Sequence, residues 1–552
     1  MNFLHMKKII PFFIFSLFSI SIVAQVPATA KKSTLSKPKL VVGIVVDQMR
    51  FDYIFRYWDK FGNDGFKRLV NQGYFCKNTN FNYVPTYTAP GHAAIYTGTA
   101  PAVNGIIANE WYDKKTGENK YCVSDNTVSG LGTSASEGKR SPANMLTTSI
   151  CDELRLSTNM KSKVIGIALK DRSAILPAGH TANAAYWYDG SVGSFISSTY
   201  YMNELPAWVT DFNKKELAKK YLSQPWNTLL PIEHYSESLP DDNKYETLAK
   251  GETKPVFPHN LPELMNKNGG LNLIRNTPFG NSLTKDFAIE TIIHENLGKS
   301  EATDFLAVSF SSPDYIGHSY GPNSVEQEDD YLRLDKDLAE LLKFIDTHVG
   351  INNTLIFLTA DHAAPEVPSY LSDLKIPSGY VNEKKMIDSL KKYFIKNCND
   401  SLILSYTNQQ LFLNHHIIES KNISLPQVVD HIVSYLQTIP EVSEVLTAEV
   451  LNNTQFTEGI RYLMQKGFNT KRSGDVFVNY LPGYINHPSA TGTTHGSPYS
   501  YDTHVPLLFY GWTIKHGSTI NQIDITDIAP TLSMMLNIPF PNGCTGKPIL
   551  FE

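Results

Sequence analysis

Three aspartates and three histidines stand at or near the ends of predicted strands, and side chains of these two types bind metal. Carboxylate oxygen and imidazole nitrogen are the normal non-sulfur ligands of Zn²⁺. Open α/β sheets place ligands beyond the carboxyl ends of parallel strands, so we expect these side chains to converge. Two metals about 4 Å apart can clamp both oxygens of an in-line phosphoryl displacement. The six residues are Asp47, Asp314, His318, Asp361, His362 and His495.

Each of the six has a simpler interpretation when it is taken alone. Asp47 could cap the helix that follows its strand. Asp314 and His318 could form a surface pair, and an Asp-His dipeptide after a strand is a common loop feature. The joint pattern is what favours a two-metal site, because every motif falls at the end of the sheet where ligands gather.

A hydroxyl at the start of a predicted helix is the candidate nucleophile. Thr88 precedes Ala89-Pro90 and a run of small residues within Tyr83–Gly98. Thr is a good helix N-cap, and Pro is tolerated in the first turn. The hydroxyl would lie at the positive end of the helix dipole, where an anion is stabilised. Thr88 is therefore either only a cap or a nucleophile beside bound metal.

Two cations follow the second predicted strand. Lys170 and Arg172 stand two residues apart, and on an extended segment they would point to the same side. Both could then contact the non-bridging oxygens of a dianionic phosphate. The alternative is a solvated basic pair at the strand end.

Continuous β-branched runs predict the strands that position these residues. Such runs are typical of strands buried on both faces of a parallel sheet. Alternation with helices predicts an α/β fold with a mostly parallel sheet. The expected strands are Lys39–Val46, Lys163–Leu169, Asp304–Phe310, Thr354–Thr359 and Val505–Tyr510, and the expected helices are Phe51–Gly73, Ser141–Leu156, Lys285–Leu297, Glu328–His348 and Asp527–Leu536.

Two stretches break the alternation and are interpreted as insertions. Residues 186–278 are rich in Tyr, Trp, Asn and Pro and have no clear period. Residues 369–484 carry their own pattern, with strands at Leu402–Tyr406 and Gln410–Leu413 and a helix at Leu425–Gln437. We expect both to lie at one edge of the sheet as a cap.

Composition narrows the class of protein. The 552 residues are 42% hydrophobic and 19% charged, which is ordinary for a globular chain, and the formal net charge of −5 argues against nucleic-acid binding. Five cysteines without a CxxC pair exclude a Cys-type zinc ribbon and permit one or two disulfides.

The N-terminus has the pattern of a secretory signal. Lys7 and Lys8 precede an apolar run that is short for a bilayer span. We predict a signal peptide at 1–24, a flexible leader at 25–39 and a catalytic domain at 40–552. The mature chain is expected in the periplasm or outside the cell, without a membrane span; an uncleaved anchor is the alternative.

Taken together, these motifs resemble the alkaline phosphatase superfamily. The chain looks most like the secreted bacterial phosphate-irrepressible alkaline phosphatases, which use Thr as nucleophile. The resemblance spans about Leu40 to the C-terminus and implies a three-layer α/β fold, with a mostly parallel central sheet flanked by helices and with cap insertions. The motifs are Val-Val-Asp47, Thr88-Ala-Pro-Gly-His, Asp314-Tyr-Ile-Gly-His318, Thr-Ala-Asp361-His362 and Thr-His495-Gly.

The resemblance implies roles for these residues. Asp314, His318 and His495 would hold one Zn²⁺, and Asp47, Asp361, His362 and the Thr88 oxygen would hold the other. Thr88 would attack phosphorus and form a phosphothreonine that water hydrolyses. Ala363 stands where relatives have Gly, at a position that is not itself a ligand. We expect two Zn²⁺ and no third, Mg²⁺, site.

Three further residues define the expected substrate. In these relatives an Asn at the place of Asn109 donates to a phosphoryl oxygen, and a monoester presents the second negative charge that Lys170 and Arg172 would bind. The predicted enzyme is a monomeric phosphatase of small phosphate monoesters. The first alternative is a phosphodiesterase or nucleotide pyrophosphatase on the same scaffold. A sulfatase, a phosphoglycerate mutase relative and a non-enzymatic binding protein fit the motifs less well.

Overall fold

The computed structural model describes residues 36–551, and its centre is a parallel sheet built from the β-branched runs. Five adjacent strands, in the order β10-β1-β9-β6-β7, all run in the same direction. Side chains of these strands are buried on both faces, as their continuous apolar sequence predicts. The strands are β1 (Leu40–Val46), β6 (Val164–Ala168), β7 (Ala184–Asp189), β9 (Asp304–Phe310) and β10 (Thr354–Thr359).

Antiparallel strands extend this sheet at both edges. The fifth predicted strand is β17 (His504–Gly511), and it runs antiparallel to β10 and to β2. On the other side, β8 pairs antiparallel with β7, and β5 with β8. The edge strands are β2 (Tyr74–Asn80), β5 (Gly130–Leu131), β8 (Ser194–Ser198), β18 (Gly517–Thr519) and β19 (Ile523–Asp524).

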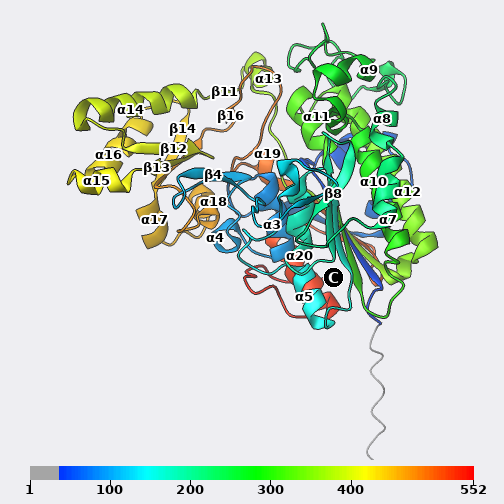
Figure 1. Ribbon diagram of the computed structural model, residues 1–552. Helices are drawn as coiled ribbons and strands as arrows, with labels where there is room; N and C mark the ends of the chain where they lie inside the picture. The colour runs from blue at the N-terminus through cyan, green and yellow to red at the C-terminus, as the bar shows by residue number, and fades with distance from the viewer. Residues whose placement is uncertain (1–35, 552) are drawn as a thin grey trace, which may run out of the picture. The chain divides into compact units, whose positions relative to one another are not determined.

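Helices cover both faces of the sheet and complete three layers (Figure 1). α10 (Phe279–His294) and α12 (Val325–His348) lie on one face, and α3 (Thr88–Thr97) lies on the other with α5 (Ile150–Ser157) and α20 (Ile528–Leu536). The predicted α/β fold with a mostly parallel sheet is therefore confirmed.

Two helix predictions were too long. The stretch 51–73 holds α1 (Tyr53–Arg56), a 3-10 turn (Trp58–Lys60) and α2 (Phe66–Gln72). The helix breaks because the backbone N–H groups of Gly62 and Phe66 donate to the buried carboxylate of Asp335. In the stretch 141–156 the helix begins only at Ile150, after the N-cap Ser149.

The first predicted insertion starts inside the main sheet. Its residues 186–198 belong to β7 and β8, and only the chain after them leaves the sheet. That chain forms α7 (Ala207–Lys214), α8 (Leu217–Tyr221) and α9 (Leu261–Leu264) and packs on α12. Trp226 Nε1 donates to Asp329 Oδ2 at 2.7 Å, and His259 Nε2 lies 3.1 Å from Glu326 Oε1.

This contact predicts that stability falls as the pH rises. Burial alone would lower the pKa of His259, but hydrogen bonds to Glu252 and Glu326 raise it to about 9. A raised pKa contributes stability below about pH 6.5 that is lost as the pH passes 9, and up to about 3 kcal/mol of unfolding free energy depends on it. Burial also raises the pKa of Glu246 to about 10, which acts in the same direction.

Denaturant unfolding at about pH 6 and pH 9.5 measures this dependence. His259→Gln is expected to reduce this pH dependence and leave the part due to Glu246, whereas the exposed His516→Gln should leave it unchanged. Equal pH dependence in the wild type and in His259→Gln would contradict the assignment.

The second insertion has its own sheet and its own hydrophobic core. Strands pair in the order β12-β13-β15-β14, and α14 and α16 cover them. The strands and helices predicted here are confirmed within a residue or two. The elements are α13 (Pro368–Asp373), β11 (Gly379–Tyr380), α14 (Glu383–Cys398), β12 (Ile403–Thr407), β13 (Gln410–Leu413), α15 (His415–Ser420), α16 (Leu425–Leu436), β14 (Val442–Thr447), α17 (Ala448–Asn453), α18 (Gly459–Gly467), β15 (Val476–Tyr480) and β16 (Tyr484–Ile485).

The first insertion shares the hydrophobic core of the main sheet, whereas the second has a core of its own (Figure 1). They touch where the ring of Tyr245 packs against Tyr370 and its hydroxyl donates to Asp373. The second insertion also packs on the hairpin of β3 (Glu110–Asp113) and β4 (Glu118–Tyr121), where Tyr112 meets Phe412.

Several predictions concern the cysteines and the N-terminus. All five cysteines are free, so the permitted disulfides are not formed.

Within residues 36–551, none of the helices is long and apolar enough to cross a bilayer. The signal peptide and most of the leader lie outside the described residues. Lys39 is already tied to the sheet, since its N–H donates to Asn353 and its carbonyl accepts from Asp304.

Candidate active site

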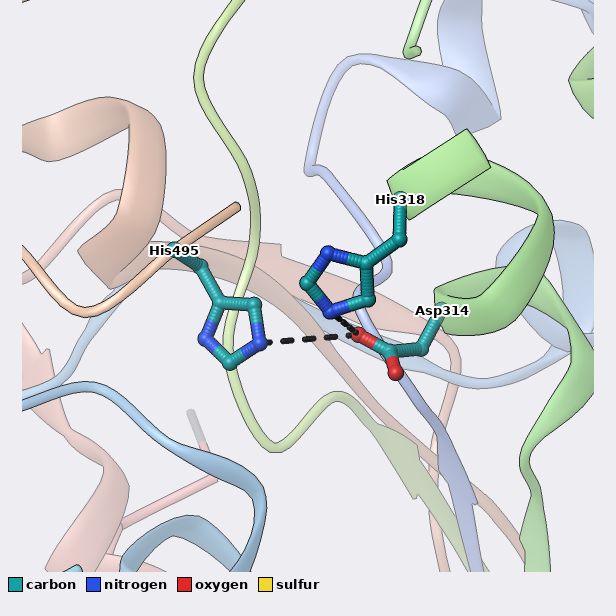
Figure 2. A group of neighbouring side chains, drawn as sticks. All are labelled: Asp314, His318 and His495. Atoms are coloured by element: carbon teal, nitrogen blue, oxygen red, sulfur yellow. Dashed lines mark ion pairs between the residues drawn. The ribbon is translucent and has the colours of Figure 1, made fainter. Parts of the chain in front are cut away.

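The first ligand group joins a short helix to a distant loop. Asp314 and His318 lie one turn apart on α11 (Ser312–Tyr320), directly after β9, and His495 comes from the segment before β17 (Figure 2). His318 Nε2 lies 3.2 Å from Asp314 Oδ1, and His495 Nε2 lies 3.6 Å from the same oxygen. One ligand atom from each residue falls within 4.8 Å of the others, so the three can share one metal.

The second ligand group stands at the ends of β1 and β10. Asp47 follows β1, and Asp361 and His362 follow β10 after one intervening residue. All three are fully buried, and one ligand atom from each lies within 4.8 Å of the others. His362 Nε2 is 3.6 Å from Asp47 Oδ1 and 3.7 Å from Asp361 Oδ2. The six Asp and His residues predicted as metal ligands thus fall into two groups.

The two groups are neighbours. The imidazole rings of His362 and His495 stack with centroids 3.5 Å apart and planes at 14°. Lys170 Nζ bridges the groups, at 2.7 Å from Asp47 Oδ2 and 2.5 Å from Asp314 Oδ2. The site is therefore one continuous cluster with two metal-binding halves.

The three histidines are held in the orientation that a metal ligand needs. In each ring Nδ1 faces a backbone carbonyl oxygen and Nε2 faces the carboxylates. The distances from Nδ1 are 2.8 Å to Thr493 for His318, 3.1 Å to Ala363 for His362 and 2.7 Å to Thr86 for His495. A proton on Nδ1 leaves the Nε2 lone pair free to bind metal. Burial also lowers the pKa of His495 to about 3, so that ring is neutral.

The charge state of the three buried carboxylates suits the binding of metal cations. Burial and the neighbouring Asp361 raise the pKa of Asp47 well above its usual range, and burial raises the pKa of Asp361 to about 7. Burial acts on Asp314 as well, but His318 and Lys170 outweigh it and hold its pKa well below the usual range. Among residues 36–551, no group donates a hydrogen bond to Asp47 Oδ1 or Asp361 Oδ2, although both atoms are buried. Bound cations would satisfy these oxygens.

Thr88 lies beside the second group, at the start of α3. Its hydroxyl Oγ1 is 3.5 Å from His362 Nε2, and the residue is 1% exposed. Thr88 is not the N-cap, which corrects the prediction: Tyr87 occupies that position, and Thr88 is the first helical residue. The hydroxyl nevertheless stays at the positive end of the helix.

Helix α3 approaches the second group without a side chain in between. A Cβ on Gly91 would stand 2.2 Å from the carbonyl oxygen of Asp361 and 2.8 Å from its Cβ. Only Gly permits this approach. The contact fixes Thr88 relative to Asp361.

Lys170 and Arg172 are positioned by a helix rather than by an extended segment. Lys170 is the N-cap of α6 (Asp171–Ala178), and Arg172 lies in its first turn. Arg172 Nη1 donates to the Tyr121 hydroxyl at 3.1 Å, while its buried Nε has no partner in the described chain. Lys170 contacts both ligand groups directly, and Arg172 contacts neither ligand group.

Asn109 is anchored by one end of its amide. Its Oδ1 accepts a hydrogen bond from the backbone N–H of Ala89 at 2.8 Å, which ties it to the start of α3. The Nδ2 group makes no hydrogen bond within residues 36–551, so it is available to donate.

Sequence reasoning missed residues that support the ligands. Gln48 Nε2 donates to Asp314 Oδ1 at 2.7 Å, and the Gln48 backbone takes a left-handed φ of 63°. His92 Nδ1 lies 3.3 Å from Asp361 Oδ2. His92 stands inside a quoted motif and Gln48 directly follows one, so a search of residues next to Asp47 and one helical turn after Thr88 would have found them. No motif in the sequence pointed to Tyr121, whose hydroxyl accepts a hydrogen bond from Arg172.

Comparison with known proteins agrees with this geometry. A family model described as type I phosphodiesterase / nucleotide pyrophosphatase matches residues 41–498. The chain is 46% identical over 526 residues to a calcium-transporting ATPase of Myroides odoratus, covering 95% of this chain and 96% of the relative. It is 43% identical over 539 residues to the alkaline phosphatase PafA of Elizabethkingia meningoseptica, covering 97% and 98%.

A solved structure supports the same relationship. The crystal structure of wild-type alkaline phosphatase PafA superposes with a TM-score of 0.90 at 44% identity, covering 93% of this chain and 99% of that one. The agreement extends over nearly the whole of both chains, so it includes the insertions. The chain therefore belongs to the type I phosphodiesterase / nucleotide pyrophosphatase family of the alkaline phosphatase superfamily, as an enzyme of the alkaline phosphatase kind.

Proposed function

We propose that the protein hydrolyses phosphate monoesters through a phosphothreonine at Thr88, with two Zn²⁺ held by the two ligand groups. The observation that carries the proposal is the position of Thr88 Oγ1, 3.5 Å from His362 Nε2 and at the positive end of α3. A threonine hydroxyl is a weak nucleophile, and metal coordination is an activation that this position supports. When bound, Zn²⁺ would lower the pKa of coordinated oxygen groups and neutralise charge that develops at phosphorus.

The protein's own residues bind and orient the phosphoryl group in this proposal. The free Nδ2 of Asn109 would donate to one phosphoryl oxygen, and the free Nε of Arg172 to another. Lys170 would balance the second negative charge. Thr88 would attack in line with the leaving oxygen, which would depart on the side of Asp314, His318 and His495. Attack of water on phosphorus would then regenerate the Thr88 hydroxyl.

The same scaffold could serve a phosphodiesterase, and the family model bears that name. The buried Lys170 and the half-buried Arg172 favour the monoester, because a diester carries one negative charge where a monoester carries two. The deciding measurement compares the kcat/KM values of an aryl phosphate and a bis-aryl phosphate on one preparation. Faster turnover of the diester would overturn the proposal.

Chelation is expected to abolish activity, because three buried carboxylates then lose their counter-charges. Prolonged dialysis against a chelator should remove more than about 90% of turnover, and Zn²⁺ should restore it. Mg²⁺ alone is the matched control and should not restore the activity. Full activity in a sample whose metal content is shown to be zero would exclude the two-metal assignment.

The remaining proposals concern the location, the oligomeric state and the substrates of the enzyme. We propose export to the periplasm or the cell exterior through the signal at 1–24, and a monomeric mature chain. Small phosphate monoesters are the proposed partners, and nucleic acid is not. The name of the Myroides odoratus relative adds ATP to the proposed substrates, because its terminal phosphoryl group presents the same two charges as a monoester.

A further inference from the structure

A polar cavity of about 270 Å³ opens beside the candidate site. Tyr87 lines it, directly before Thr88 in the chain, and so does His495 of the first ligand group. The Tyr87 ring packs edge-on against the His495 ring, with centroids 5.6 Å apart. The cavity therefore shares a wall with the half of the site from which the leaving oxygen would depart.

The second insertion forms the opposite wall. The turn between β12 and β13 places Asn408 and Gln409 at the cavity, with left-handed φ values of 52° and 60°. Asn408 Nδ2 donates to the carbonyl oxygen of Glu110 at 2.7 Å. Glu110 follows Asn109 in the chain, so the β12–β13 turn is fixed next to a residue that is proposed to bind the phosphoryl group.

The lining of the cavity is acidic. Two carboxylates line it, Glu383 and Asp502, and none of its lining residues is Lys or Arg. Asp502 is fully buried: its Oδ2 oxygen accepts from the backbone N–H groups of Gly496 and Ser497, and its Oδ1 oxygen has no partner in the described chain. Glu383 is the carboxylate that a bound group would meet on the side of the insertion.

Glu383 is held in a fixed position by its neighbours. The Tyr480 hydroxyl donates to Oε1 at 2.7 Å, and Asn486 Nδ2 donates to Oε2 at 2.6 Å. The Tyr406 hydroxyl lies 2.8 Å from that of Tyr480 and extends the network. The hydroxyl of Tyr87, by contrast, makes no hydrogen bond within residues 36–551. One fixed acceptor and one free hydroxyl thus face the same space.

We propose that this cavity binds the leaving alcohol of the phosphate ester, and that Glu383 selects leaving groups with hydroxyl or ammonium donors over leaving groups with an anion. The inference rests on the proposed phosphatase function. Thr88 and its ligand group lie on one side of phosphorus, so an in-line displacement directs the leaving group away from them and toward His495. A negative charge in a partly enclosed cavity attracts donors and repels anions.

Three monoesters of similar size test the selection. Glycerol 1-phosphate has a neutral leaving group, phosphoethanolamine a cationic one and 3-phosphoglycerate an anionic one. Values of kcat/KM are measured at about pH 8.5, where the amine is protonated. Inhibition by inorganic phosphate, which has no leaving group, is measured in parallel.

The variants change charge inside and outside the cavity. Glu383→Gln is expected to raise the rate for 3-phosphoglycerate relative to glycerol 1-phosphate by roughly three- to tenfold, and to lower that for phosphoethanolamine. Gln409→Glu adds an anion to the wall without disturbing the Glu383 network and should shift both ratios the other way. Asp388→Asn removes an exposed charge from the same helix and should leave the ratios as in the wild type.

The outcomes are distinct. Unchanged ratios in both Glu383→Gln and Gln409→Glu, with normal phosphate inhibition, would overturn the cavity assignment and leave the phosphatase proposal intact. Equal shifts in Asp388→Asn would show a general effect of net charge and would also overturn it. Failure of the wild type to hydrolyse any of the three esters would overturn the proposed function itself and this inference with it.

Discussion

Thr88→Ala is expected to lower kcat for an aryl phosphate by at least about 10³-fold, because it removes the hydroxyl that stands at the start of α3, 3.5 Å from His362 Nε2. Thr88→Ser keeps a hydroxyl at the same position and should retain much of the activity. Steady-state rates, metal content and circular dichroism on the same samples separate lost chemistry from lost structure.

Thr97→Ala is the matched control for this change. Thr97 is a buried threonine on the same helix, and its hydroxyl donates to the backbone carbonyl of Ala93. Its removal should leave kcat near the wild-type value. Acid quenching with a ³²P-labelled substrate should trap label on the wild type and none on Thr88→Ala. Wild-type rates in Thr88→Ala would show that another group attacks phosphorus.

Arg172→Ala has the second large expected effect, and it acts on substrate choice. The kcat/KM value for an aryl monoester should fall by about 10² to 10³-fold, whereas that for a bis-aryl diester should fall less than about tenfold. The reason is the second charge of the monoester, which a half-buried guanidinium whose Nε has no partner in the described chain can bind. Arg172 is the cleaner test than Lys170, because Lys170 also pairs with Asp47 and Asp314.

Arg140→Ala is the control for this change. Arg140 Nε donates to Asp171 Oδ2 at 2.8 Å, so this second arginine contacts the residue directly before Arg172 in the chain. Arg140→Ala should lower the kcat/KM values of the monoester and of the diester equally, and only slightly. If Arg172→Ala lowers kcat/KM equally for monoester and diester, the guanidinium does not bind the second negative charge of the monoester.

The sheet and the ligand groups could be predicted because their signals are local. A buried parallel strand requires a continuous apolar run, and four runs gave the strands β1, β6, β9 and β10 almost residue for residue. Polar residues after such runs must gather at one sheet edge. That rule brought Asp47, Asp314 and Asp361 together without any knowledge of the loops.

Features that depend on distant contacts could not be predicted in this way. The helix expected at 51–73 breaks because the carboxylate of Asp335, far along the chain, accepts hydrogen bonds from two of its backbone N–H groups. Lys170 and Arg172 stand at a helix start, which no local pattern distinguished from an extended end. The separation of the two insertions likewise follows from tertiary packing, since the first packs on α12 and the second on the β3–β4 hairpin.

The close approach of Gly91 to Asp361 has a mechanical consequence. With backbone against backbone, α3 and the end of β10 have no compressible side chain between them, and packed interiors transmit displacement rather than absorb it. Thr88 and Asp361 therefore move as one rigid body. The second insertion packs around its own hydrophobic core, and its β12–β13 turn, which Asn408 ties to Glu110, lines the cavity through which molecules enter. Access and attack geometry are thus governed by separate mechanical parts of the enzyme.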